Sequence, residues 1–335
     1  MSDAKHVWAL ILAAGDGSRL RALTTKPCGT AVPKQFCSLD GGHSLLEEAI
    51  TRASKLVPQN RICTIVAQQH RQWWAESREL SRLPHDNLIV QPRNRGTGIG
   101  ILYSVLHIVA KDPEARIVML PSDHYVRDEA VLRDSLKLAI DRIEEGKDRP
   151  VLLGIEPDVS DSDLGYIVPG GPDTAGGQRV AQFLEKPNET IAQELIDQGA
   201  LWNSFIIAAT AQTLLNMFLP RYSAMVMEMQ IILSRRLSLN LPAGAWPALV
   251  DLYMRLPALD FSRAILEEKV DKLCVVRVPP CGWSDLGTPR RVGQTLQQLK
   301  PKSPDTSASE WSTTSYLSLA AQHAQFERIT QLGVG

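Results

Sequence analysis

The chain has 335 residues, in which 36 Lys and Arg nearly balance 37 Asp and Glu to leave a formal net charge of −1. This balance excludes a protein that depends on a basic surface to bind nucleic acid or a membrane, and 44% hydrophobic with 22% charged residues is typical of a globular protein. Five cysteines without a Cys-x-x-Cys pair exclude a disulfide framework and a zinc-finger spacing, so we expect reduced thiols and a cytoplasmic location.

The first apolar run, residues 7–14, passes directly into Gly15-Asp16-Gly17-Ser18-Arg19. Such a run could be the core of a signal peptide, but its passage into a polar glycine loop indicates a strand instead. No other stretch approaches the roughly 20 apolar residues of a transmembrane helix. We therefore expect a soluble chain that is not processed.

Strand-like and helix-like segments alternate through the first half of the chain. The predicted strands are residues 7–12, 61–66, 87–90 and 116–120. Helices are predicted where apolar residues recur three and four positions apart, at residues 44–56, 68–83, 98–110 and 129–145. Ser44 and Glu47 form a capping box at the start of the first helix. The alternation predicts an α/β fold, in which helices flank a mainly parallel sheet.

Beyond Pro150 the strands become more closely spaced, at residues 151–155, 165–168, 180–184 and 201–208. This change predicts that the sheet becomes mixed. Residues 300–315 contain two prolines and many Ser and Thr, which is typical of a linker between a domain over residues 1–299 and a tail over residues 316–335. The tail is predicted to form a C-terminal helix. This helix would pack either on the body of the same chain or on a second subunit, so the sequence does not decide whether the protein is a homodimer.

The loop after the first strand has the features of a phosphate-binding loop. Its glycines let the backbone approach an anion, and successive N–H groups form a concave site for phosphate. Arg19 and Lys34, the latter within Val32-Pro33-Lys34-Gln35-Phe36, would add positive charge suited to a triphosphate. A dinucleotide fingerprint would need a glycine at Leu20 and a P-loop would need Gly-Lys-Ser/Thr, so both are excluded. An ordinary glycine turn with a surface Arg19 is the remaining alternative.

Two aspartates that are far apart in the chain each follow an apolar segment. Asp123 follows residues 118–120, at the edge where ligands bind to open α/β sheets, and Asp285 lies in Cys281-Gly282-Trp283-Ser284-Asp285-Leu286-Gly287-Thr288. Each alone is more typical of a turn, but if the fold brings them together a cation has to offset their repulsion. Carboxylate ligands beside substrate phosphates favour Mg²⁺. His124 has no second ligand at zinc spacing, so we interpret it as a packing residue.

The order of these segments resembles the sugar-1-phosphate nucleotidylyltransferases, and among them the mannose-1-phosphate guanylyltransferases, over residues 7–290. The resemblance implies a Rossmann-like nucleotidyltransferase domain that makes GDP-mannose and pyrophosphate from GTP and mannose-1-phosphate. The matching segments are the glycine loop, Pro33-Lys34-Gln35-Phe36, Gln91-Pro92-Arg93-Asn94-Arg95-Gly96-Thr97, Pro121-Ser122-Asp123-His124, Gly165-Tyr166-Ile167, Glu185-Lys186-Pro187, Trp202-Asn203-Ser204 and Trp283-Ser284-Asp285.

The resemblance also implies a role for individual residues. The catalytic residues it implies are Arg19, Lys34, Asp123, Lys186 and Asp285. Of these, the two aspartates, Asp123 and Asp285, are expected to hold Mg²⁺. The nucleotide is expected to contact Ala14, Gly15, Gly17, Ser18, Gln91, Asn94, Gly96 and Thr97. The sugar phosphate is expected to contact Gly165, Glu185 and Asn203.

Several departures from the family pattern concern the substrate more than the reaction. Ala14 and Phe205 stand where the family usually has glycine, and Thr288-Pro289 replaces a usual Ser-Trp. Two alternatives to this function therefore remain. The chain could be an enzyme of the same type that uses another base or sugar, or a weakly catalytic subunit that senses nucleotide sugars. We expect no second catalytic domain after residue 300, such as the isomerase that is fused in some longer relatives.

Overall fold

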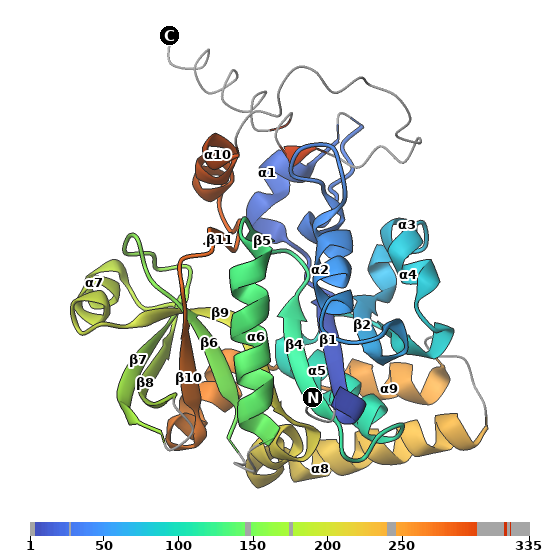
Figure 1. Cartoon of the computed structure of the whole chain (residues 1–335). Coiled ribbons are helices and arrows are strands. Elements are labelled where there is room, and N and C mark those ends of the chain that lie inside the picture. Colours follow the sequence, from blue (N-terminus) through green and yellow to red (C-terminus); the bar gives the residue numbers. More distant parts are fainter. Residues whose placement is uncertain are drawn as a thin grey trace.

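The computed structural model describes residues 4–26, 28–144, 149–173, 177–239 and 246–299, together with Ser318, Leu319 and Gln322 (Figure 1). The strands are β1 (Val7–Ala13), β2 (Ile62–Ala67), β3 (Leu88–Gln91), β4 (Arg116–Pro121), β5 (Tyr125–Val126), β6 (Val151–Ile155), β7 (Gly165–Pro172), β8 (Gln178–Glu185), β9 (Leu201–Thr210), β10 (Cys274–Val278) and β11 (Trp283–Ser284). The α-helices are α1 (Arg21–Thr24), α2 (Leu45–Ser54), α3 (Arg71–Trp74), α4 (Arg78–Arg82), α5 (Gly96–Val109), α6 (Glu129–Glu144), α7 (Glu189–Asp197), α8 (Ala211–Ser238), α9 (Pro247–Arg255) and α10 (Pro289–Gln298).

In the described part of the chain, nine strands form one sheet in the order β3-β2-β1-β4-β9-β6-β10-β8-β7. Strands β1 to β4 are parallel to one another, as are β6 and β10. β9 is antiparallel to β4 and β6, and β8 is antiparallel to β7 and β10. β8 and β9 therefore oppose the other strands, which confirms the predicted α/β fold with a mixed, mainly parallel sheet. A separate ladder pairs β5 with β11.

Alternating side chains of β1 enter two hydrophobic cores, one on each face of the sheet. Val7, Ala9 and Ile11 pack in the core that includes α2 and α6, whereas Trp8 and Leu10 pack in the core that includes α5, α8 and α9. A strand that is buried on both faces is typical of a sheet covered by helices on both sides. Figure 1 shows α2 and α6 across the near face of this sheet. None of the helices in the described ranges is long and apolar enough to span a bilayer.

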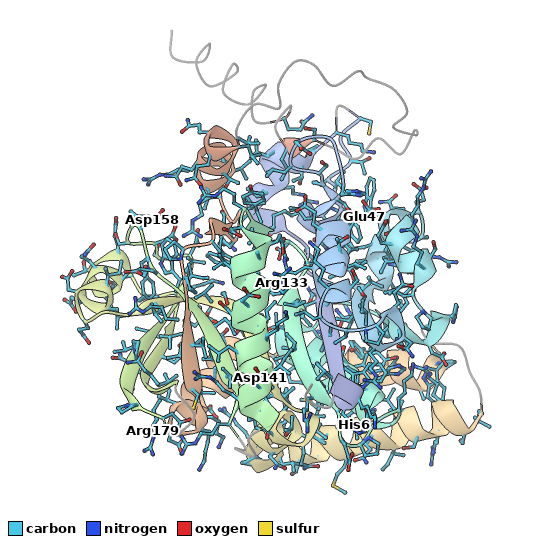
Figure 2. All side chains as sticks on the ribbon, viewed as in Figure 1. His6, Glu47, Arg133, Asp141, Asp158 and Arg179 are labelled. Atoms are coloured by element: carbon cyan, nitrogen blue, oxygen red, sulfur yellow. The ribbon has the colours of Figure 1, made fainter. Side chains whose placement is uncertain are left out.

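The helices of the near face follow the local signals of the sequence. On α6, Leu132 and Leu136 are fully buried, four positions apart, so that one stripe of the helix faces the sheet. Asp141 is exposed and lies on the outer side of the same helix (Figure 2). At the start of α2, Ser44 and Glu47 form the predicted capping box, which satisfies the first free N–H groups of the helix.

The single helix predicted for residues 68–83 is wrong, because the segment is divided into the 3-10 helix Gln68–His70, α3 and α4. The indole N–H of Trp74 donates to the carbonyl of Ala67 at 2.9 Å. The hydroxyl of Ser77 accepts from the N–H of Leu80 and starts α4 as a new helix. Such local bonds between side chain and backbone compete with continuation of a helix.

The predicted linker over residues 300–315 lies outside the described residues, as does the predicted tail except for Ser318, Leu319 and Gln322. Leu319 is completely buried in the near-face core. Its N–H donates to the carbonyl of Ser38 at 2.7 Å. At Leu319, therefore, the chain packs on the body of the same molecule.

Candidate active site

A cavity of about 370 Å³ lies where β1, β3 and β4 end, which is the carboxyl edge of the parallel strands. Its volume is in the range of small-molecule sites. The predicted site residues that line it are Ala14, Gly15, Gly17, Arg19, Gln91, Asn94, Gly96, Thr97, Asp123, Gly165, Glu185, Lys186, Asn203 and Asp285. Two predicted residues are not in this lining: Ser18 begins the 3-10 helix Ser18–Leu20, and Lys34 is buried beside the cavity.

The glycine loop is held by the side chain of Gln35. Its Nε2 donates to the carbonyl of Ala13 at 3.1 Å and to that of Gly15 at 2.9 Å. Gly17 has a φ of 61°, and a Cβ there would lie 3.0 Å from the backbone nitrogen of Lys34. Both observations favour glycine at this position, where the loop turns over the lysine segment.

The segment predicted to contact the base is tied to the glycine loop. Asn94 donates through Nδ2 to the carboxylate of Asp16 at 3.1 Å and accepts the N–H of Gly96 at 2.9 Å. The hydroxyl of Thr97 accepts the N–H of Phe261 at 2.9 Å. Two side chains that the sequence assigns to the nucleotide thus already have protein partners, and they shape the wall against which a base would lie.

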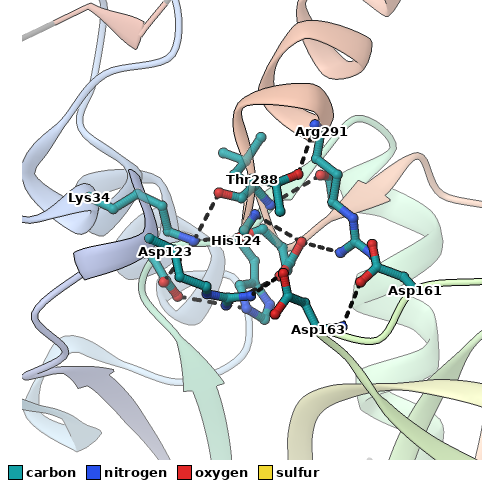
Figure 3. Close-up of polar contacts among 12 residues, drawn as sticks. Lys34, Asp123, His124, Asp161, Asp163, Thr288 and Arg291 are labelled. Carbon is teal, nitrogen blue, oxygen red and sulfur yellow. Dashed lines mark hydrogen bonds and ion pairs between the residues drawn. The ribbon is translucent and has the colours of Figure 1, made fainter. Parts of the chain in front are cut away.

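Asp123 and Asp285 meet at one wall of the cavity, as predicted from the sequence. The β5–β11 ladder pairs Tyr125 with Ser284 and so joins the segments that carry them. Lys34 lies between the two segments (Figure 3). Its Nζ is 2.9 Å from Oδ2 of Asp123 and donates to the backbone carbonyl of Asp285. The lysine thus bridges the two aspartate segments.

Both carboxylates are ionised at neutral pH. Burial is the largest influence on the pKa of Asp123 and raises it, but the charge and hydrogen bond of Lys34 together with His124 outweigh burial and hold the pKa below its ordinary value. Burial is likewise outweighed at Asp285, where the charges of Arg291 and then Lys34 lower the pKa. Burial lowers the pKa of His124 to about 4, so this side chain is neutral at pH 7. Its ring packs edge-on against Trp283 at 5.2 Å, in keeping with a packing role.

The donor set of this wall suits Mg²⁺. Oδ1 of Asp123 lies 3.7 Å from His124, and Oδ2 of Asp285 lies 3.8 Å from Arg19, so each carboxylate keeps one oxygen without a close donor among the described residues. The charge of Asp285 acts to raise the pKa of Asp123, which is the repulsion that a shared cation would offset. In the described ranges no group of three or more His, Cys, Asp or Glu side chains is arranged so that it could hold a metal ion by itself. Water and substrate phosphates would therefore supply the other ligands.

At the other end of the cavity Glu185, Lys186 and Asn203 converge above Gly165. A Cβ on Gly165 would clash with the carboxylate of Glu185 and touch Asn203, so glycine leaves room for both. Oδ1 of Asn203 accepts the N–H of Phe205 at 3.0 Å, which leaves the amide NH₂ to act as a donor. Burial raises the pKa of Glu185, and Lys186, at 3.6 Å, partly offsets this rise. An acceptor beside a donor suits the hydroxyl groups of a sugar.

The profile of the family described as "Nucleotidyl transferase" matches residues 8–300. The chain belongs to this family. It is 32% identical over 301 residues to mannose-1-phosphate guanylyltransferase 2 of Escherichia coli O157:H7, a match that covers 86% of this chain and 59% of the relative. It is 29% identical over 337 residues to a mannose-1-phosphate guanylyltransferase of Salmonella montevideo, covering 97% of this chain and 67% of the relative. The chain therefore spans 59% to 67% of the length of these two relatives.

Solved structures agree with this fold. One described as a mannose-1-phosphate geranyltransferase from Thermus thermophilus has a TM-score of 0.71 at 27% identity, over 88% of this chain and 80% of that chain. One described as a mannose-6-phosphate isomerase from Helicobacter pylori has a TM-score of 0.64 at 20% identity, over 83% of this chain and 99% of that chain. The resemblance drawn from the sequence motifs and the Rossmann-like nucleotidyltransferase fold are both confirmed.

Several residues of this nucleotidyl transferase site were missed by the sequence analysis. Asp163 lines the cavity and lies 3.5 Å from Arg19. Asp161 contacts Arg291, which comes from α10. The two aspartates could have been noticed because they closely precede Gly165, whereas no local pattern marks Arg291.

Three residues other than glycine have a positive φ in the described part of this nucleotidyl transferase: Lys186 (54°), Phe205 (57°) and Leu286 (47°). Lys186 and Phe205 line the cavity, and Leu286 directly follows Asp285. This conformation costs roughly 1–2 kcal/mol for a residue with a Cβ and persists where the surroundings impose it, often at a functional site. The positive φ of Phe205 is a conformation that glycine adopts without strain, in keeping with the glycine that the family pattern leads us to expect at this position.

Proposed function

We propose that the chain is a nucleotidyltransferase that transfers a guanylyl group from GTP to mannose-1-phosphate, giving GDP-mannose and pyrophosphate. The observation that carries the proposal is one cavity lined by the glycine loop, two ionised aspartates and a donor–acceptor pair suited to a sugar. The choice of GTP and mannose-1-phosphate is supported by relatives named mannose-1-phosphate guanylyltransferase.

The reaction is an in-line displacement at the α-phosphorus of the triphosphate. An oxygen of the sugar phosphate forms a bond to this phosphorus while the bond to the oxygen of departing pyrophosphate breaks. The second pKa of a phosphate monoester is about 6, so the nucleophile is already largely dianionic at neutral pH and needs no base. The main barrier is the approach of two polyanions, and positioning with charge neutralisation supplies the catalysis.

Cationic side chains around the cavity serve this neutralisation. Arg19 is half exposed and lies 3.5 Å from Asp163, so it can exchange this loose contact for triphosphate oxygens. Lys186 serves the sugar phosphate. Lys34 is bound to the two aspartate segments, and we assign it to holding them together as well as to balancing the charge of the triphosphate.

Asp123 and Asp285 are the residues that would hold Mg²⁺. When bound there, the ion offsets the negative charge of the two phosphate groups that meet in the cavity. The protein contributes two ionised side chains whose orientations are set by Lys34 and Arg291.

The test is an assay of pyrophosphate release by the purified chain, with each nucleoside triphosphate paired with each of a panel of sugar-1-phosphates. We expect the highest kcat/KM for GTP with mannose-1-phosphate. A higher value for another pair would keep the reaction and change the substrates. No release with any pair, while nucleotide sugars still bind, would contradict the proposal and support a sensing subunit.

A further inference from the structure

We infer that Arg291 is a positioning residue that makes Asp285 a one-oxygen metal ligand and thereby favours Mg²⁺ over Ca²⁺. The inference rests on the proposed function only in taking Asp285 as a metal ligand. It concerns a residue of α10 that does not line the cavity.

Arg291 is held on several sides in a buried setting. Its side chain is 9% exposed, its guanidinium carbon lies 5.1 Å from the ring centre of Trp202, and its backbone N–H donates to the N-cap hydroxyl of Thr288. One branch of the guanidinium contacts Oδ1 of Asp285, and the other lies 2.6 Å from Oδ2 of Asp161 (Figure 3). A planar fork of this kind fixes an angle that a single ammonium group cannot.

Asp161 is itself fixed, so the fork has a firm support. Its Oδ1 accepts the N–H of Asp163 at 2.8 Å, and its backbone N–H donates to the hydroxyl of Tyr166 at 2.8 Å. Tyr166 is completely buried. The chain of contacts therefore runs from the core, through Asp161 and Arg291, to Asp285.

The two oxygens of Asp285 have different surroundings as a result. Oδ1 accepts from Arg291 and from the N–H of Gly287, the latter at 3.0 Å. Oδ2 lies 3.8 Å from Arg19, which lines the cavity. A Cβ on Gly287 would clash with Oδ2, so glycine at this position leaves the oxygen its place. Only Oδ2 of this carboxylate is left to bind a cation in the cavity.

A one-oxygen carboxylate discriminates between cations of different size. Mg²⁺ requires near-ideal octahedral geometry and commonly binds one or two carboxylates together with water and phosphate, whereas Ca²⁺ accepts more ligands and two-oxygen carboxylates. With Arg291 removed, Oδ1 keeps only the N–H of Gly287 as a partner, so Asp285 is freer to rotate and to offer both oxygens. Loss of the arginine should therefore weaken Mg²⁺ binding and weaken Ca²⁺ binding less, or strengthen it.

The experiment measures Mn²⁺ binding to the whole chain by electron paramagnetic resonance, with Mg²⁺ and Ca²⁺ as competitors. For Arg291→Met we expect Mg²⁺ affinity to fall about tenfold, as for other residues that orient a metal ligand, and the Mg²⁺/Ca²⁺ preference to fall with it. Asp161→Asn weakens the contact that supports Arg291 and leaves Asp285 unchanged, so it should shift the Mg²⁺/Ca²⁺ preference in the same direction by less. This variant tests the inference if Arg291→Met does not fold.

Arg52→Met is the matched control. Arg52 is 4% exposed and forms a fork on Glu129, so its loss also breaks a buried arginine–carboxylate pair, but neither residue lines the cavity. It should lower the melting temperature and leave the Mg²⁺/Ca²⁺ preference unchanged. An unchanged preference in Arg291→Met and Asp161→Asn would overturn the inference.

Asp285→Asn separates this inference from the proposed function. Mn²⁺ binding that is absent in the wild type, or equal in wild type and Asp285→Asn, would overturn the inference even if guanylyl transfer is observed. Conversely, the expected metal selectivity in a chain that transfers no nucleotide would retain the inference and reject the proposed function.

Discussion

Asp123 lines the cavity and contacts the ammonium group of Lys34, so replacing it with asparagine tests whether its negative charge is needed for the reaction. Asp123→Asn keeps the size of the side chain and an acceptor oxygen for Lys34, which lies 2.9 Å from Oδ2 of the aspartate. We expect pyrophosphate release to fall at least about 10²-fold, the loss typical of one electrostatic group acting in a transition state. Near-normal release from a folded variant would remove Asp123 from the mechanism.

Phe205 is a second residue of the cavity, and its substitution tests the effect of its ring and of its positive φ. Phe205→Gly removes roughly 1–2 kcal/mol of backbone strain. It also loses about 0.5–1.5 kcal/mol of ring contact with Phe261, whose centroid is 6.3 Å away, and adds about 0.5–1 kcal/mol of glycine entropy. These three contributions nearly cancel, so the apolar area that the ring buries against the core of α5, α8 and α9 decides the sign, and the unfolding free energy should fall.

The same substitution should act on sugar selectivity, because Phe205 lines the cavity beside Asn203, which we assign to the sugar. We expect Phe205→Gly to narrow the ratio of kcat/KM between the best and second-best sugar-1-phosphate by about tenfold, as for other changes of one pocket group. Phe205→Leu keeps the positive φ but removes the ring. Unchanged ratios in both variants would show that the ring does not select the sugar.

At the scale of elements, α2 carries a carboxyl group that makes stability depend on pH. Burial raises the pKa of Glu48 from 4.5 to about 7, although Arg52 offsets part of the rise. Between these values the native state keeps a proton that the unfolded chain has released. The stabilisation is therefore complete below about pH 4.5 and is lost as the pH rises through about 7.

Glu48→Gln cannot ionise, so it should remove this dependence. Relative to the wild type, its unfolding free energy should increase by up to about 3 kcal/mol between pH 4.5 and 7 and stay level above that. Urea denaturation at several pH values measures the difference. Asp141→Asn, on the exposed side of α6, is the control. If the unfolding free energy of Glu48→Gln varied with pH in the same way as that of the wild type, the raised pKa of Glu48 would be contradicted.

The elements also show where local patterns stop being sufficient. The capping box at Ser44 and Glu47 predicts the start of α2 because all of its bonds lie within one turn. The apolar spacing of residues 68–83 predicts one helix, yet bonds from Trp74 and Ser77 to the backbone divide it. Periodicity reports which side chains are buried and does not report such bonds.

At the scale of the whole molecule, Leu319 lies beyond α10, the last described helix, and packs in the hydrophobic core. It is completely buried, and its N–H donates to Ser38. Leu319→Ala should lower the unfolding free energy by about 2–5 kcal/mol, since it leaves a cavity in the core. The kcat of the folded protein should not change, because Leu319 does not line the active-site cavity. If Leu319→Ala had the same denaturation midpoint as the wild type, the contact of Leu319 would not stabilise the body.

The sequence alone was sufficient for the α/β class, for the family and for most residues of the cavity, because strand alternation, glycine loops and short motifs are local properties of the chain. The tertiary structure decided what joins them. Lys34 binds the two aspartate segments, and Arg291 orients Asp285 from Asp161. The contacts of Lys34 with both aspartate segments, and that of Arg291 with Asp161, link residues far apart in the chain. Their geometry depends on the order of strands in the sheet, which no local pattern encodes.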